Sequence, residues 1–138
     1  MIRILSIICL IVLSISVLFQ TGCQNTQQLP GTLEGTVTIG PIFPVERPGE
    51  PRPVPAQVFE NRKVIVYNKT GKRIIETIDL KQIEQSVKAS YSAQLAPGQY
   101  VIDISHGGID RSSDVPKKIE IVSGQTVVVN IDIDTGIR

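Results

Sequence analysis

Apolar residues recur at every second position along most of this chain, and that period constrains the fold more than any other feature. The clearest stretch is residues 86–95, whose apolar members are separated by single polar residues: Val87, Ala89, Tyr91, Ala93 and Leu95. Successive side chains of a β-strand point to opposite faces, whereas a helix repeats its apolar positions every three to four residues. The alternation therefore predicts strands with one buried face.

Seven such segments follow one another, separated by turn residues. They cover residues 32–40, 62–68, 72–80, 86–95, 99–105, 117–122 and 126–134. Short strands with turns at intervals of about 8 to 12 residues are typical of an all-β sandwich. We predict a single seven-stranded antiparallel Greek-key sandwich over residues 32–138, with at most one helical turn, within residues 80–87.

The alternation also predicts which side chains face the core. Beyond residues 86–95, the inward set is Leu33, Val37, Ile39, Tyr100, Ile102, Ile104, Ile119, Ile121, Val127, Val129, Ile131 and Ile133. Ala96-Pro97-Gly98 has the composition of a tight turn, because Pro fixes φ and Gly tolerates a positive φ. We predict that this turn closes a hairpin between residues 86–95 and 99–105.

Two short motifs resemble a known family. They are Leu95-Ala96-Pro97-Gly98-Gln99-Tyr100-Val101 and the final run from Ile119 to Val127, which follow an early strand with Gly35 and Val37. Together they resemble the carboxypeptidase regulatory-like domains, which share the transthyretin-like (prealbumin-like) sandwich, over about residues 32–134. The resemblance implies the fold and an accessory, non-catalytic role, since such domains occur beside peptidases, on surface proteins and in envelope transport systems. It names no partner.

Residues 1–22 have the organisation of a signal peptide. Arg3 precedes an apolar run of 16 residues from Ile4 to Phe19, which is shorter than the roughly 20 residues that span a bilayer. Thr21-Gly22-Cys23 resembles the lipobox of bacterial lipoproteins, although Gln20 stands where that family prefers Leu. The resemblance implies cleavage before Cys23 and acylation of its sulfur; a signal anchor with an incidental cysteine remains the alternative.

The cysteine content agrees with lipidation. Cys9 lies within the apolar run, and no cysteine follows Cys23, so the domain cannot contain a disulfide. Residues 23–31 are polar and predict a short tether. Gln24 follows the cysteine, which by resemblance to known sorting patterns implies the outer membrane if the source is Gram-negative, and otherwise the cell surface.

A proline-rich insertion occupies residues 40–55, with six prolines. Proline lacks an amide donor and fixes φ, which excludes helix and interior strand and favours polyproline II. One interpretation is a stiff recognition loop presenting Phe43, Glu46, Arg47 and Arg52. The other, which we favour, is a cover for a sheet edge, with Ile42, Phe43 and Val45 packed on the domain.

A second loop, residues 106–116, collects the remaining candidate site residues: His106, Asp110, Arg111 and Asp114. Their spacing matches no Ca²⁺ or Zn²⁺ template, so we predict neither a metal site nor a cofactor. We expect the aspartates to cap turns and Asp110 to pair with Arg111. Because loops at the end of a sandwich often carry binding residues, both loops are candidate interaction surfaces.

Charge and residue content argue against several functions. Without residues 1–22 the chain has 13 basic and 13 acidic side chains, with no basic stretch that would follow a nucleic acid backbone. The single histidine and the absence of a G-x-S-x-G motif argue against nucleophilic catalysis. Asn130 is expected on the outward face, which argues against a Lys–Asn isopeptide bond of the kind seen in collagen-adhesin domains.

These features predict a non-enzymatic, lipid-anchored cell-envelope accessory or protein-binding module. Its expected partners are the membrane, through the lipid on Cys23, and an unidentified envelope protein. The alternative is a carbohydrate- or small-ligand-binding surface lipoprotein, in which Tyr67 and Tyr100 would be the aromatic contacts. The absence of Trp argues against that alternative, since sugar-binding surfaces usually need aromatic platforms.

Overall fold

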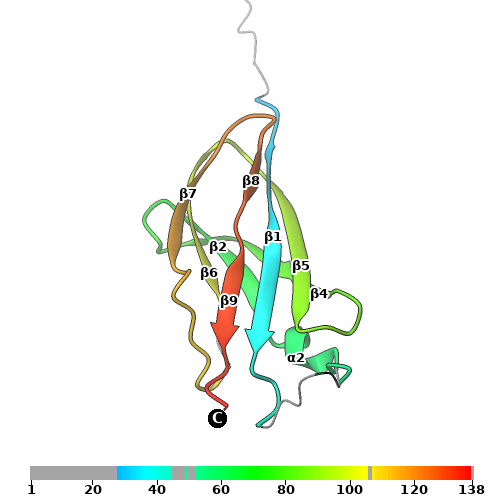
Figure 1. Ribbon diagram of the computed structural model, residues 1–138. Helices are drawn as coiled ribbons and strands as arrows, with labels where there is room; N and C mark the ends of the chain where they lie inside the picture. The colour runs from blue at the N-terminus through cyan, green and yellow to red at the C-terminus, as the bar shows by residue number, and fades with distance from the viewer. Residues whose placement is uncertain (1–27, 45–48, 50–51, 106, 138) are drawn as a thin grey trace, which may run out of the picture.

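Two β-sheets pack face to face in the computed structural model, which describes residues 28–44, 49, 52–105 and 107–137 (Figure 1). The five-stranded sheet contains, in order, β4 (Lys81–Gln82), β5 (Lys88–Leu95), β1 (Gly31–Gly40) and then both β8 (Thr126–Val128) and β9 (Ile131–Asp134). The four-stranded sheet has the order β3 (Ile74–Asp79), β2 (Lys63–Asn68), β6 (Gly98–Ile104) and β7 (Lys117–Ile121). The predicted all-β sandwich is confirmed.

Each predicted segment contains a strand. The structure differs from the prediction in three elements. Residues 80–87 contain no helix; Lys81–Gln82 forms β4 instead, because the chain of β3 continues through Leu80 into the other sheet. A short helix, α2 (Gln57–Glu60), follows the proline-rich insertion and was not predicted. The last predicted strand is divided into β8 and β9.

The predicted hairpin between residues 86–95 and 99–105 is wrong. β5 pairs with β1 and β4, whereas β6 pairs with β2 and β7, so the turn at Ala96-Pro97-Gly98 carries the chain from one sheet to the other. The hydroxyl of Tyr100 donates a hydrogen bond of 2.8 Å to the carbonyl of Ala96 and holds this crossing in place. Turn composition fixes a local reversal, but it does not decide which sheet receives the next strand.

The sandwich is also not antiparallel throughout. β1 pairs in parallel with β8 at Thr32–Glu34 and with β9 at Val37–Gly40. Between these two ladders, the buried hydroxyl of Tyr91 donates a 2.6 Å hydrogen bond to the carbonyl of Val129, and the side-chain oxygen of Asn130 accepts from the backbone N–H of Thr36 at 3.1 Å. The N–H of Val129 still donates to the carbonyl of Glu34 at 2.9 Å, so these side chains supplement the backbone hydrogen bonds at the break.

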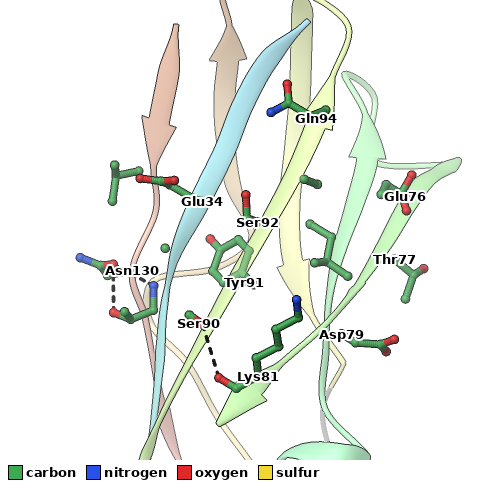
Figure 2. Close-up of a pocket in the computed structure, with 15 residues that line it drawn as sticks. Glu34, Glu76, Thr77, Asp79, Lys81, Ser90, Tyr91, Ser92, Gln94 and Asn130 are labelled. Carbon is green, nitrogen blue, oxygen red and sulfur yellow. Dashed lines mark hydrogen bonds between the residues drawn. The ribbon is translucent and has the colours of Figure 1, made fainter. Parts of the chain in front are cut away.

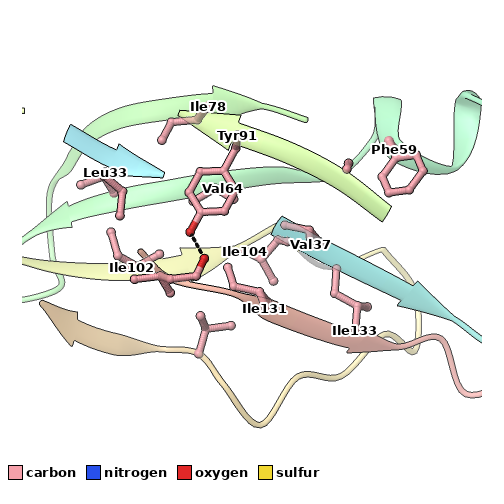
Figure 3. Close-up of a cluster of buried hydrophobic side chains, with 14 of the residues drawn as sticks. Leu33, Val37, Phe59, Val64, Ile78, Tyr91, Ile102, Ile104, Ile131 and Ile133 are labelled. Carbon is pink, nitrogen blue, oxygen red and sulfur yellow. Dashed lines mark hydrogen bonds between the residues drawn. The ribbon is translucent and has the colours of Figure 1, made fainter. Parts of the chain in front are cut away.

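The core lies between the two sheets and matches the predicted pattern (Figure 3). Most of the predicted inward residues are buried, and Val87, Ala93, Tyr100, Ile119 and Val127 are partly buried against them. Val54 and Phe59, at 4% and 3% exposure, also belong to the core although no strand contains them. The insertion and α2 therefore close one end of the sandwich.

Different segments of the chain lie at the two ends of the sandwich. The chain enters β1 beside the turn between β7 and β8, where Ser123 Oγ donates to the carbonyl of Leu29 at 2.9 Å and the N–H of Gly124 to that of Pro30 at 3.2 Å. Residues 29–31, predicted as tether, are thus already part of the domain. The described residues of the insertion, α2 and the end of β9 lie at the opposite end (Figure 1).

Candidate functional site

The loop of residues 106–116 is held to the domain by Asp110. Its carboxylate accepts from Arg62 Nε at 2.7 Å and from the N–H of Gly107 at 3.4 Å, and its side chain is only 4% exposed. The Arg62 guanidinium also donates to the carbonyl of Val58 in α2. The expected Asp110–Arg111 pair is wrong: Arg62 precedes β2 and reaches Asp110 from a distant part of the sequence.

The same loop covers the outer edge of β9. The backbones of Arg111 and Asp134 exchange two hydrogen bonds of 2.8 Å, and the carboxylate of Asp114 accepts from the N–H of Asp132 at 2.8 Å. Asp114 therefore binds the backbone of β9, 18 positions away, instead of capping its own turn as expected. A shallow hollow of about 480 Å³ beside it is lined by Arg111, Ser112, Ser113, Asp132, Asp134 and neighbouring residues.

The described parts of the proline-rich insertion pack on the domain. The N–H of Val54 donates to the carbonyl of Gln85 at 2.8 Å, and the side-chain amide of Gln82 donates to that of Val54 at 2.8 Å. The Arg52 guanidinium lies 5.3 Å from the centre of the Phe43 ring, within range of a cation–π contact. These contacts show packing of Val54 and of the Phe43–Arg52 pair, whereas Val45, Glu46 and Arg47, like His106 and Cys23, lie outside the described residues, so the choice between cover and recognition loop stays a prediction.

A third feature, which sequence reasoning missed, is a groove of about 800 Å³ beside β5. Figure 2 shows the side chains along its two sides, from β3 on one and from β5 and β1 on the other. Its polar lining consists of Glu34, Thr36, Glu76, Thr77, Asp79, Lys81, Ser90, Ser92, Gln94 and Asn130. We call it the β3–β5 groove.

The exposure of Glu76 marks the place where the groove opens to solvent. It lies opposite Val66 in the β2–β3 ladder, so both side chains belong to the same face of the sheet. Val66 is completely buried, but Glu76 is exposed, because the five-stranded sheet does not extend over the end of β3. The sequence signal was a charged residue at an inward position of a predicted strand.

Tyr91 also lines the groove and has a structural role. It is 3% exposed, and burial raises its pKa to about 12. The phenol therefore keeps its proton at neutral pH and donates to Val129, which leaves it unsuited to acid–base chemistry. The exposed carboxylates and hydroxyls of the groove can accept and donate hydrogen bonds and attract cations.

The described residues contain neither a cluster of metal ligands nor a helix that could span a membrane. Over residues 28–44, 49, 52–105 and 107–137, no three His, Cys, Asp or Glu side chains gather closely enough to hold a metal ion. Within the same ranges, no helix has the length and apolar content needed to cross a bilayer.

Comparison with known proteins gives little beyond the fold. No family model and no curated protein matches the chain. Among solved structures, the chain is similar to GBS52, a minor pilin of Streptococcus agalactiae, with 16% identity and a TM-score of 0.40. The match covers 77% of this chain but only 45% of the pilin, so the chain spans less than half of that protein. A likeness at this level supports no functional argument.

Proposed function

We propose that this protein is a non-catalytic, lipid-anchored module of the cell envelope that binds another protein through loops held away from the membrane. The observation that carries the proposal is the placement of the two ends. The described chain enters at the end formed by the β7–β8 turn, while α2, residues 107–116 and the described residues of the insertion lie at the other (Figure 1). β1 has 10 residues, and a strand rises about 3.3 Å per residue, so it separates the two ends by about 33 Å.

The lipid anchor is tested by Cys23→Ala. We expect the variant to lose its acyl mass and to leave the membrane fraction, or to accumulate with residues 1–22 uncleaved, because the thiol that would carry the lipid is gone. The matched control is Cys9→Ala, which removes the other cysteine and leaves the proposed processing site intact. Equal membrane partitioning of both variants, with no acyl mass on the parent chain, would contradict the proposal.

Protein binding is tested by cross-linking the chain in cells and identifying the captured proteins by mass spectrometry. We expect one dominant envelope protein, linked through the distal loops. Arg111→Glu reverses an exposed charge there, and its backbone pairing with Asp134 does not depend on the side chain. Capture should therefore fall while the fold persists. Undiminished capture by Arg111→Glu, together with links confined to the opposite end, would reject the distal loops.

The β3–β5 groove favours the second candidate, a carbohydrate- or small-ligand-binding lipoprotein. Its volume of about 800 Å³ and polar lining suit a hydroxyl-rich ligand. Tyr67 is partly exposed, but the Tyr100 hydroxyl is already bonded to Ala96. A glycan-array signal that disappears with Glu76→Gln would favour this function, and one lost only with Tyr67→Ala would place the ligand outside the groove.

A further inference from the structure

The edges of the two sheets are not equally protected against pairing with another chain. The outer edge of β9 is covered by Arg111 and Asp114, and the edge of β5 is paired with β4 at Ala89 and Ser90. β7 carries Lys117 and Lys118, and lysines on an edge strand oppose strand addition. The edges of β9 and β7 are therefore protected, and β4 protects β5 at these two of its eight residues.

The edge of β3 lacks such protection. β3 pairs with β2 on one side, and among the described residues no strand pairs with its other side. It contains neither Lys nor Pro, and it presents Ile74 and Ile75 at 54% and 38% exposure. Two features oppose pairing at this edge, the irregularity in its register at Val66/Tyr67 of β2 and the charged Glu76 at an inward position, but neither covers the backbone. The β3–β5 groove runs beside this edge and leaves space for an added strand.

The order of charges along this edge favours pairing with a second, antiparallel copy of the same segment. Lys72 and Arg73 precede the exposed isoleucines, and Glu76 and Asp79 follow them. An antiparallel copy of the same segment would place basic residues against acidic ones at both ends, whereas a parallel copy would align like charges. Asp79 contacts Lys63 at 2.7 Å, but its side chain is 79% exposed and can accept a second cation.

We propose that the β3 edge, residues 72–79, is a self-association site at which two copies of this chain pair their β3 strands antiparallel about a two-fold axis. The pairing joins the two four-stranded sheets and is isologous, so both copies use the same residues. A six-residue edge buries less than the area of about 1,200 Å² typical of stable complexes, so the dimer is weak in dilute solution. Confinement to a membrane, which rests on the proposed function, raises the effective concentration; the pairing itself does not depend on it.

The test uses the full chain in detergent, as an equal mixture of unlabelled and ¹⁵N-labelled protein, treated with a zero-length carbodiimide that joins amines to carboxylates. We expect mixed light–heavy links from Lys72 to Asp79 or Glu76. Lys72 and Asp79 lie seven residues apart in one chain, about 20 Å along an extended strand, so a link between them must join two copies.

Charge reversal separates this edge from other contacts. Arg73→Glu should lower the yield of mixed links about five- to tenfold, because two symmetry-related attractions become repulsions. Lys118→Glu, the same charge reversal on the β7 edge, should leave the yield unchanged. Ile75→Lys, which places a lysine on the edge, should abolish the links while the circular dichroism spectrum stays that of the parent.

Three results would overturn the proposal. Mixed links could be absent, or equally abundant in all variants, which would assign association to another part of the chain. Alternatively, the β3 edge could link to a strand of a different protein and never to itself. Unchanged membrane partitioning of Cys23→Ala, with no acyl mass on the parent chain, would refute the anchor without affecting links measured in detergent, so the two proposals fail separately.

Discussion

Gly35 is the position at which the close approach of three strands is most directly testable. A Cβ added there would lie 1.8 Å from the carbonyl oxygen of Val129, 2.7 Å from its carbonyl carbon and 3.1 Å from Cε1 of Tyr91. The nearest atoms belong to backbone, so no rotamer change can relieve the contact. Gly35→Ala must push β1 away from the break between β8 and β9.

The cost follows from two effects. Overpacking of a buried site typically costs about 1–3 kcal/mol. Displacing Val129 from Tyr91 leaves a buried carbonyl without its donor, which costs about 1–3 kcal/mol more. We expect Gly35→Ala to lower the free energy of unfolding by about 2–6 kcal/mol, a large share of the roughly 5–15 kcal/mol of an ordinary domain.

Urea unfolding followed by circular dichroism measures this loss. The control is Gly40→Ala on the same strand, where an added Cβ would meet nothing within 4 Å and where φ is not in the left-handed region. We expect that control to change stability by less than about 0.5 kcal/mol. If the two alanine variants unfolded at the same urea concentration, the argument from the Gly35–Val129 approach would be refuted.

Other predictions concern the hydrogen-bonded side chains. Burial raises the pKa of Tyr91 from 10.0 to about 12, so the folded state keeps a proton that the unfolded chain loses. Stability should be unaffected below pH 10 and fall by up to about 3 kcal/mol between pH 10 and 12. The stability of Tyr91→Phe, measured over the same alkaline range, should not show this loss. If the variant lost stability between pH 10 and 12 as the parent does, the assignment to Tyr91 would be wrong. Asp110→Ala leaves the Arg62 guanidinium largely buried without its carboxylate and should cost about 2–4 kcal/mol. In Arg62→Met with Asp110→Leu most of that cost should disappear, as thermal unfolding would show; additive losses would count against the buried pair.

The strands could be predicted because their signal is local. Alternation places Leu33, Val37 and Ile39 on one face whatever the rest of the chain does, and these residues are buried. The pairing of strands could not be predicted in the same way. Pro97-Gly98 reverses the chain equally well within one sheet or between two, and the choice depends on β1 and β2 occupying the neighbouring positions.

The site was less predictable because its contacts join distant residues. The sequence predicted an ion pair for Asp110 with its neighbour Arg111. The actual partner is Arg62, which is 48 positions away. The β3–β5 groove draws its lining from β1, β3, β4, β5 and β8, so no short motif contains it. Glu76 at an inward position was the one local clue. The roles of Cys23, Glu46, Arg47 and His106 remain predictions.

The parallel pairing of β1 with β8 and β9 has a mechanical consequence. The chain enters β1 at one end of the sandwich, and β9 finishes at the other, so a pull applied between these two points runs along both strands. The ladder bonds then resist sliding together, whereas a hairpin pulled from its open end unzips one bond at a time. We expect single-molecule stretching between the start of β1 and the end of β9 to need a higher force than stretching across the β2–β3 hairpin. A surface protein with this arrangement would stay folded under a tension directed away from its anchor.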